Sequence, residues 1–433
     1  MTTPPYLSRR SFLGLTGAAA GAVLLGACSS GGSGGGEPGV QEIDWWHIQN
    51  GEPLKPVWQE FADEFMAANS GVKINITDRE NEAFKAALTT ATQAGNPPDL
   101  FQSWGGGVLR EQVQAGVVKD ITDAVSGWVG NIIPAALGPY TIDGRIYGIP
   151  WDVGMVGFWY NKDHFAQAGI TSPPATWSEL LAAVDALKEA GIVPIALAGA
   201  DKWPAHFWWS YLAIRIGGLE LLAQAEADGD FNKPDFIRAG EEFKRLIDKE
   251  PFQPGFLAAG YGAPDGQAAA VGNGQAAMEL MGQWAPAVQA ANTPDEKGLG
   301  DKLGFFPFPT VEGGKGKSTD VFGGGNGFAV GRDAPDATLD FLKYFLDVEQ
   351  QRRAAETGAI LPTVKGAEDA IKDPNAKVVA ETFAQATGFQ LYLDQAFPPA
   401  VGTQVNDSVA ELVAGNKSPA EIVQDITATA QNQ

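Results

Sequence analysis

The feature that most constrains the fold is an alternation of strand-like and helix-like segments near the start of the globular part. Residues 40–46 alternate loosely between apolar and polar side chains, as a half-buried strand does. Apolar residues then recur at helical spacing over 54–65, and a second alternating segment follows at 72–76. A helical segment at 84–94 and a short apolar segment at 99–101 continue the series. Because strands joined by helices pair in parallel, this order predicts a parallel sheet covered on both faces.

Similar patterns predict elements along the rest of the chain. Thr176 with Glu179, and Ser418 with Glu421, have the spacing of capping boxes that begin helices. One amphipathic helix is expected over 339–356. Further strands are expected over residues 145–150, 154–160, 192–198, 276–280 and 305–308. The whole chain is therefore predicted to be α/β.

The N-terminal residues have a pattern of export. Arg9-Arg10 precedes an apolar, small-residue segment that ends in Leu-Gly-Ala before Cys28, which is typical of a Tat-type lipoprotein signal. We expect residues 1–27 to be removed, Cys28 to carry the lipid, and residues 28–39 to form a Gly/Ser linker. Two or more acyl chains anchor a protein durably. The predicted location is therefore the extracellular face of the cell membrane.

Composition limits the chemistry that the chain can perform. The formal net charge of −22 repels nucleic acid and anionic surfaces. With Cys28 lipidated, no thiol remains for a disulfide, a nucleophile or a metal site. Only three histidines occur, and no pair has helical i, i+4 spacing. We expect no cofactor, no metal site and no nucleic-acid partner. Aromatic residues are abundant, with 12 tryptophans.

Several short motifs resemble family 1 of the extracellular solute-binding proteins of bacterial ABC importers, which mostly bind carbohydrates. They occur in the family's order and cover the whole mature chain. They are residues 96–101, 143–150, 159–162, 174–180, 274–278, 282–284 and 323–330. Three further segments resemble actinobacterial xylobiose-binding proteins, namely residues 102–107, 202–204 and 387–392.

The resemblance implies a two-lobed α/β fold of the type II periplasmic-binding-protein kind, with a hinge and a central cleft. Lobe 1 would comprise residues 40–152 plus 322–360, and lobe 2 residues 153–321 plus 361–433. It also implies a monomeric, non-enzymatic protein that closes its lobes on an oligosaccharide, of the xylobiose class, and delivers it to an ABC permease.

A sugar has polar hydroxyls and an apolar C–H face, so its site needs aromatic plates together with carboxylates or amides. In parallel sheets ligands lie beyond the carboxyl ends of strands. Trp284 is the foremost candidate, because it follows a strand where the family has a stacking aromatic; packing in the core is the competing interpretation. The other candidates are Glu80, Asn81, Trp46, His47, Ser103, Trp104, Trp151, Asp152, Trp203, His206 and Asn326.

Competing interpretations exist for several candidates. Glu80 and Asn81 have the alternative role of capping a helix. His47 has the alternative role of a structural histidine that does not contact a ligand. The glycines after Trp104 would let the backbone approach a ligand closely. We expect four other tryptophans to serve packing alone, namely Trp45, Trp58, Trp128 and Trp177.

Two other functions remain open from the sequence. A surface-anchored glycoside hydrolase would need two carboxylates at a fixed separation. A binder of peptides or amino acids would need an arginine to hold a free carboxylate, and Arg79, Arg110 and Arg145 lie near predicted strand ends.

Overall fold

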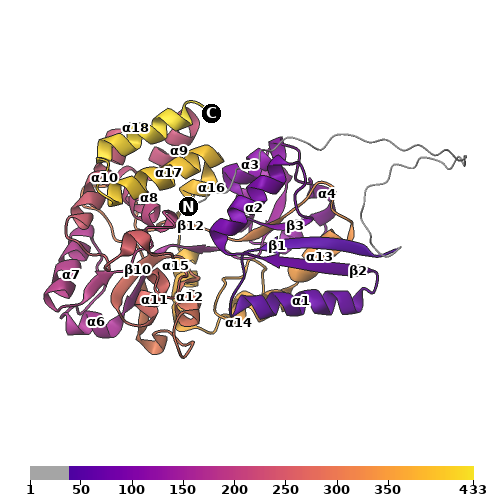
Figure 1. Cartoon of the computed structure of the whole chain (residues 1–433), viewed down its shortest axis with the longest axis horizontal. Coiled ribbons are helices and arrows are strands. Elements are labelled where there is room, and N and C mark those ends of the chain that lie inside the picture. The colour runs from indigo at the N-terminus through magenta and orange to yellow at the C-terminus, as the bar shows by residue number, and fades with distance from the viewer. Residues whose placement is uncertain (1–38) are drawn as a thin grey trace, which may run out of the picture. The chain divides into compact units, whose positions relative to one another are not determined.

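A computed structural model describes residues 39–433, so the predicted signal peptide, Cys28 and all of the linker except its last residue lie outside the described residues. Two main β-sheets, each packed with helices, define two lobes (Figure 1). The fold is α/β, as the sequence predicts. Among residues 39–433, no helix combines the length and the apolar character needed to cross a membrane.

Lobe 1 is built on a five-stranded sheet with the order β2-β1-β3-β13-β6. Its first three strands pair in parallel, whereas β13 and β6 run antiparallel to their neighbours, so the predicted parallel sheet is mixed. The strands are β1 (Gln41–His47), β2 (Val72–Asp78), β3 (Leu100–Ser103), β6 (Gly148–Pro150) and β13 (Gly327–Val330). The helices are α1 (Leu54–Ala68), α2 (Asn81–Gln93), α3 (Gly106–Gln114), α4 (Thr122–Val125), α5 (Pro134–Leu137), α13 (Ala337–Phe345) and α14 (Val348–Glu356).

The core of lobe 1 follows from the alternation of β1. Ile43, Trp45 and His47 are the buried residues of that strand. The Trp45 ring lies 5.0 Å from that of Phe341, and Trp58 of α1 lies 4.7 Å from Phe345, measured between ring centroids. Helices α13 and α1 therefore cover one face of the sheet, with α13 packed on β1 and α1 packed on β2, and Trp45 and Trp58 are core residues.

Lobe 2 is built on a four-stranded sheet with the order β11-β8-β10-β9. All six residues of β10 are buried, so this sheet is covered on both faces. The strands are β8 (Gly157–Asn161), β9 (Val193–Ile195), β10 (Ala276–Met281) and β11 (Leu303–Phe306). The helices are α6 (Lys162–Gln167), α7 (Trp177–Glu189), α8 (Trp203–Gly217), α9 (Leu219–Asp228), α10 (Pro234–Ile247), α11 (Gln267–Gly272), α12 (Ala285–Ala291), α15 (Pro374–Ala384), α16 (Leu393–Ala396), α17 (Pro399–Val413) and α18 (Pro419–Ala430).

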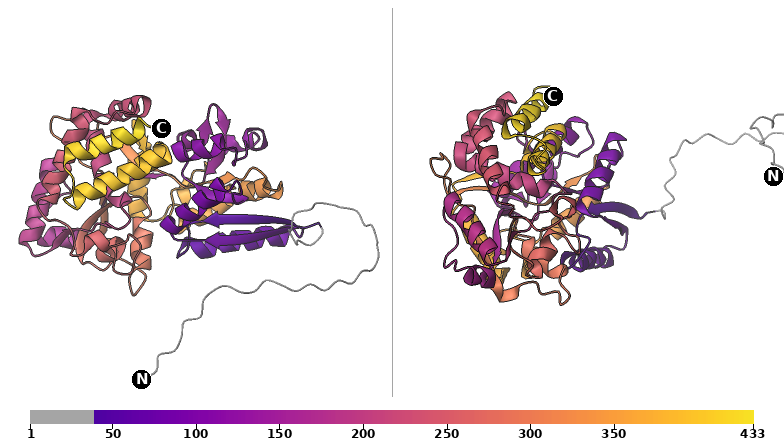
Figure 2. Two further views of the ribbon diagram at one scale, coloured as in Figure 1. Left: turned by 45° about the horizontal axis from the view of Figure 1, so that its top comes forward. Right: turned by 60° about the vertical axis from the view of Figure 1, so that its left-hand side comes forward.

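The C-terminal helices belong to lobe 2. Helix α17 packs on α8, and α18 packs on α10 and α17, so the last part of the chain completes the lobe (Figure 2). Both predicted capping boxes are present, at the starts of α7 and α18.

Smaller elements complete the structure. A three-stranded sheet lies beside lobe 2, and β4 and β5 form a hairpin. These strands are β7 (Gly154–Met155), β12 (Asp320–Gly324), β14 (Gly388–Leu391), β4 (Thr141–Ile142) and β5 (Arg145–Ile146). Short 3-10 turns occur at η1 (Val129–Asn131), η2 (Gly138–Tyr140), η3 (Phe256–Ala258), η4 (Gly300–Lys302) and η5 (Glu368–Ala370).

Three predicted elements are divided in the structure. The strand expected at 145–150 is β5 and β6, and that at 154–160 is β7 and β8, because the chain leaves one sheet and enters another in each case. The helix expected at 339–356 is α13 and α14, because the Asp347 side chain accepts a hydrogen bond from the Glu349 amide and starts a new helix.

Candidate functional site

A cavity of about 590 Å³ is lined by residues of both lobes. This volume lies in the range of small-molecule sites. Lobe 1 lines it around residues 48–54, 80–85, 104, 151–152, 325–326 and 359. Lobe 2 contributes residue 201, the start of α8, the segment 260–263, one side of α12 and the segment 392–395. Eight of the predicted site residues line it, namely Glu80, Asn81, Trp104, Trp151, Asp152, Trp203, Trp284 and Asn326.

Aromatic side chains of lobe 2 form one wall. The Trp203 ring lies 5.3 Å from Tyr261 and 6.5 Å from Trp284, between ring centroids. Tyr392 lies 6.2 Å from Trp284 and stacks on Phe207 at 5.3 Å. The Tyr392 hydroxyl is buried and has no hydrogen-bond partner among the described residues. This wall therefore offers flat apolar faces together with an unused polar atom.

Trp284 takes its place from the strand that precedes it. Strand β10 ends at Met281, and the Trp159 indole N–H donates to the carbonyls of Met281 and Gly282, at 3.2 and 2.9 Å. A Cβ atom at Gly282 would overlap the Trp284 ring, so a glycine is required for the indole to lie there. Trp284 is half-buried and reaches the cavity, and Ala285 begins α12 behind it.

Trp104 is the partly exposed aromatic side chain that lobe 1 contributes to this cavity, since Trp151 is fully buried. Its ring lies 6.0 Å from Phe84, edge to face, and the Lys85 ammonium lies 5.6 Å from its centroid. Ser103 lies next to it but is buried, and its hydroxyl accepts from the Gly105 amide at 3.1 Å. Ser103 therefore shapes the turn after β3 and does not line the cavity.

Glu80 both caps a helix and lines the cavity. Its carboxylate accepts from the amides of Glu82 and Ala83, at 3.0 and 3.2 Å, so it is the N-cap of α2. Asn81 donates to the Glu82 carboxylate at 2.8 Å. Because α2 begins at the cavity, residues at the start of this helix also line the cavity. The two interpretations of Glu80 and Asn81 are therefore compatible.

Carboxylates outnumber cations around the cavity. Asp201 accepts from the Tyr261 amide at 2.6 Å. Burial raises the pKa of Asp201, the hydrogen bond from Tyr261 opposes that rise, and the negative charge of Glu80 adds to it. Among the described residues that line the cavity none is an arginine, and Lys85 is the one lysine. The site is therefore electronegative.

A buried hydrogen-bond network joins the segments that pass between the lobes. The Asp152 carboxylate accepts from Gln283 and Asn326, both at 2.8 Å, and from the Leu361 amide at 3.0 Å. Gln102 donates to the Asn326 side chain at 2.7 Å. Burial is the main cause that raises the pKa of Asp152 to about 7. These contacts hold together three segments at which the predicted lobe boundaries fall; the boundaries themselves stay a prediction.

Four predicted site residues lie away from the cavity lining. The Arg79 guanidinium carbon lies 5.0 Å from the centroid of the Trp46 ring. Ser103 stabilises the turn after β3. His47 is buried beside Trp45, and burial lowers its pKa to about 4. His206 is fully buried in α8, with its Nε2 4.0 Å from an Asp394 oxygen, and burial lowers its pKa.

Sequence reasoning missed several residues that line the cavity. Tyr261, Tyr392 and the carboxylates of Asp201 and Asp394 are among them. Tyr392 ends one of the segments that resemble xylobiose-binding proteins, and Asp201 precedes another. Those segments could therefore have indicated both residues as candidates. Tyr261 comes from an irregular segment, which has no periodicity to indicate its position.

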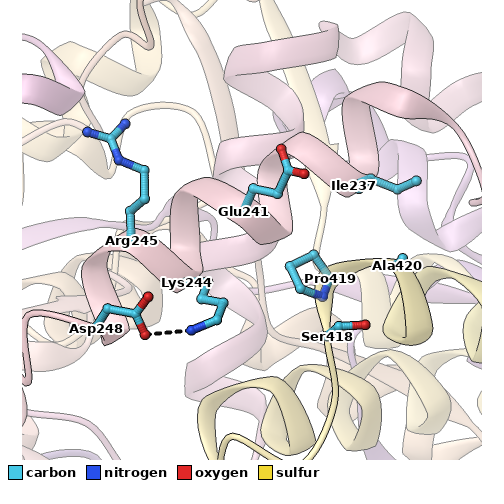
Figure 3. Close-up of a pocket in the computed structure, with 8 residues that line it drawn as sticks. All are labelled: Ile237, Glu241, Lys244, Arg245, Asp248, Ser418, Pro419 and Ala420. Atoms are coloured by element: carbon cyan, nitrogen blue, oxygen red, sulfur yellow. Dashed lines mark hydrogen bonds and ion pairs between the residues drawn. The ribbon is translucent and has the colours of Figure 1, made fainter.

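A second hollow, of about 380 Å³, lies between α10 and the start of α18 (Figure 3). Its cations are already paired: Lys244 contacts Asp248 at 2.6 Å, and Arg245 contacts Glu242 at 2.6 Å. It has no aromatic lining residue. Within residues 39–433, no group of His, Cys, Asp and Glu side chains is arranged to hold a metal ion.

Comparisons with known proteins agree with this architecture. An uncharacterized ABC transporter extracellular-binding protein of Pyrococcus horikoshii is 25% identical, over 96% of both chains. A structure solved in work on xylan utilization by Caldanaerobius polysaccharolyticus has a TM-score of 0.83 and 27% identity, covering 89% of this chain and 99% of that one. A chitin oligosaccharide binding protein has a TM-score of 0.84 and 28% identity, covering 91% and 98%.

The family assignment rests on most of the chain. Residues 51–352 match the family described as bacterial extracellular solute-binding protein. The two lobes, the cavity between them and the solved relatives agree with that match. This chain is a member of the bacterial extracellular solute-binding proteins.

Proposed function

We propose that this protein captures an uncharged oligosaccharide of the xylobiose class in the cavity between its lobes and delivers it to the permease of an ABC importer. The observation that carries the proposal is the pairing of aromatic surfaces on both sides of the cavity with carboxylates and amides. Aromatic rings pack on the C–H faces of sugars, and carboxylates accept strong hydrogen bonds from hydroxyls. The relatives described with xylan utilization and chitin oligosaccharides support a saccharide ligand.

The energetics of such a site are sufficient. A micromolar affinity corresponds to about 8 kcal/mol. Each aromatic contact contributes roughly 0.5–1.5 kcal/mol beyond its buried area. Trp104, Trp203 and Trp284 with a few charge-assisted hydrogen bonds therefore suffice, and no covalent step is needed.

Capture proceeds by closure of the lobes. A ligand that contacts both lobes only in the closed form stabilises that form by its differential affinity. Export by the Tat route and lipidation at Cys28 would keep the monomeric protein beside its permease, on the outer face of the membrane.

The charge of the cavity argues against a peptide or amino acid ligand. A free carboxylate needs a cation to bind it, and Lys85 is already close to two carboxylates, Glu82 at 3.1 Å and Asp394 at 3.8 Å. Arg79 lies at Trp46, and Arg110 contacts Asp143 at 3.6 Å. Arg145 contacts Asp120. None of these arginines lines the cavity.

Calorimetry on the full chain carrying Cys28→Ser tests the proposal. The panel contains xylobiose, cellobiose, maltose, diacetylchitobiose and a short peptide. We expect heat from at least one disaccharide, with xylobiose bound most tightly, and none from the peptide. Heat from the peptide alone would refute the proposal. Release of reducing ends from xylo-oligosaccharides would instead favour the glycoside hydrolase. A mass spectrum of the mature protein tests the lipid on Cys28.

A further inference from the structure

The start of α3 approaches lobe 2 so closely that side chains at its first two residues would overlap the backbone of lobe 2. A Cβ atom at Gly107 would lie 2.5 Å from the backbone carbonyl carbon of Phe397 and 2.7 Å from the Ala396 carbonyl oxygen. A Cβ atom at Gly106 would overlap the Gln395 carbonyl and lie 2.7 Å from a Leu391 methyl group. Cβ atoms do not approach backbone this closely, so two glycines are required here.

This contact joins the two lobes beside the cavity. Gly106 and Gly107 start α3, which follows β3 of the lobe 1 sheet. Residues 395–397 belong to α16 and its end, and α16 packs on α17 in lobe 2 (Figure 1). Trp104 and Gln395 line the cavity from the two sides of the contact. The two glycines therefore lie at the rim of the cavity and do not themselves line it.

The two sides of the contact are also complementary in charge. Lys85 of lobe 1 lies 3.8 Å from Asp394 of α16. No hydrogen bond between the two helix ends is present among the described residues. The fit at this point therefore depends chiefly on the absence of side chains at positions 106 and 107.

We propose that Gly106 and Gly107 are positioning residues that permit full closure of the lobes, so that the affinity for ligand depends on them although they do not line the cavity. A side chain at position 107 would hold the rim apart and lower the population of the closed form, which weakens binding by the same factor. This inference rests on the proposed function for its link to affinity, but the lobe contact itself is measurable without any ligand.

Gly107→Ala is the informative variant. Because the φ angle at Gly107 lies outside the left-handed region, alanine can adopt this backbone conformation, and the variant tests only the effect of the new methyl group. Gly127→Ala is the matched control, since a Cβ atom at Gly127 would have no atom within 4 Å. Both are made in a full chain with Cys28→Ser, Glu111→Cys and Ala414→Cys, which places spin labels on exposed positions of α3 and at the end of α17.

We expect two label separations in the ligand-free parent and in Gly127→Ala, a long one for the open form and a short one for the closed form. The short-separation population should be lost in Gly107→Ala. Affinity for xylobiose should weaken about tenfold in Gly107→Ala, as expected when a methyl group is forced into a packed contact. A retained short separation, or an unchanged affinity, in Gly107→Ala overturns the proposal. If no sugar binds any of the chains, the proposed function fails and the label separation still decides this inference.

A measurement on the parent chain keeps the inference testable if Gly107→Ala does not fold. Hydrogen exchange at the amides of residues 106–109 and 395–397 should slow when xylobiose, or any sugar found to bind, is added. Exchange that is slowed elsewhere at the cavity but not at either of these segments would contradict the proposal.

Discussion

At the scale of single residues, tryptophan serves two purposes in this chain. Trp45, Trp58 and Trp177 are almost fully buried and fill the cores of the lobes. Trp203 and Trp284 are only partly buried and line the cavity. For Trp284 the difference arises from its place in the chain, because it lies just after a strand end and a glycine, where the backbone leaves the sheet.

Trp284→Ala should weaken binding of the preferred sugar roughly ten- to hundredfold, because it removes a large apolar surface and an aromatic contact. Trp128→Ala is the control, since Trp128 packs against the core away from the cavity. Calorimetry measures both affinities, and thermal unfolding verifies the fold. Equal affinities in the two variants would contradict the role of Trp284.

A buried glutamate predicts how stability depends on pH. Glu279 in β10 is fully buried and accepts from Gln267 and Gln289, at 2.8 and 2.6 Å. Burial raises its pKa from 4.5 to about 7. Between these values the folded chain holds a proton that the unfolded chain has released, so the free energy of unfolding falls as the pH rises.

Glu279→Gln should reduce that fall, since it removes the ionisation and keeps the shape of the side chain. Part of the fall should remain, because burial also raises the pKa of Asp152 to about 7. Urea unfolding at about pH 5 and about pH 7.5 measures the difference, with Glu111→Gln as the exposed control. An identical pH dependence in Glu279→Gln and the parent chain would show that Glu279 does not titrate as proposed.

At the scale of elements, one buried arginine holds both ends of the segment between β11 and β12. Arg215 of α8 is buried, and its guanidinium donates to the carbonyls of Phe308, Pro309 and Asp320, at 3.1, 3.2 and 2.6 Å. It also donates to the Lys317 carbonyl at 2.9 Å. Five donors in a rigid fork match several carbonyls at once, which a lysine cannot do.

Arg215→Lys should therefore destabilise the fold, by about 1–3 kcal/mol for each buried carbonyl left without a donor. Arg238→Ala is the control, because its contacts to the carbonyls of Glu312 and Gly313 are exposed. Denaturant unfolding measures both. A loss no larger in Arg215→Lys than in Arg238→Ala would show that the carbonyls find other partners.

At the scale of the whole molecule, discontinuous chain segments build each lobe. Strand β13, from residues 327–330, inserts between β3 and β6 of the lobe 1 sheet. Helices α15 to α18 then return to lobe 2. The Trp151 amide donates to the Asn326 carbonyl at 2.8 Å, and the Val153 amide donates to the Leu361 carbonyl at 3.1 Å, so the crossings support one another. Such paired crossings suit a hinge.

Binding of xylobiose should make the protein more compact. The physical reason is that ligand contacts to both lobes favour the closed form. Small-angle scattering should show a smaller radius of gyration with saturating xylobiose and no change with a sugar that gives no heat in calorimetry. Binding of xylobiose without compaction would contradict closure as the mechanism of capture.

The sequence alone determined the properties that depend on local pattern. Alternation and helical spacing predict the α/β class, and capping boxes locate the starts of α7 and α18. Strand ends indicated Trp104, Asp152 and Trp284 as candidates, because the carboxyl ends of strands approach ligand sites whatever the details of packing.

Only the tertiary structure decided the matters that depend on distant segments. The sequence predicts that glycines 105–107 face a ligand, yet Gly106 and Gly107 contact α16, almost 290 residues later in the chain. His47 ends a predicted strand as Trp104 does, and His206 lies close to Trp203 in the sequence, yet both histidines are buried in the cores. The physical reason is that periodicity reports which face of an element is buried, whereas the partner that buries it is chosen by the packing of the whole chain.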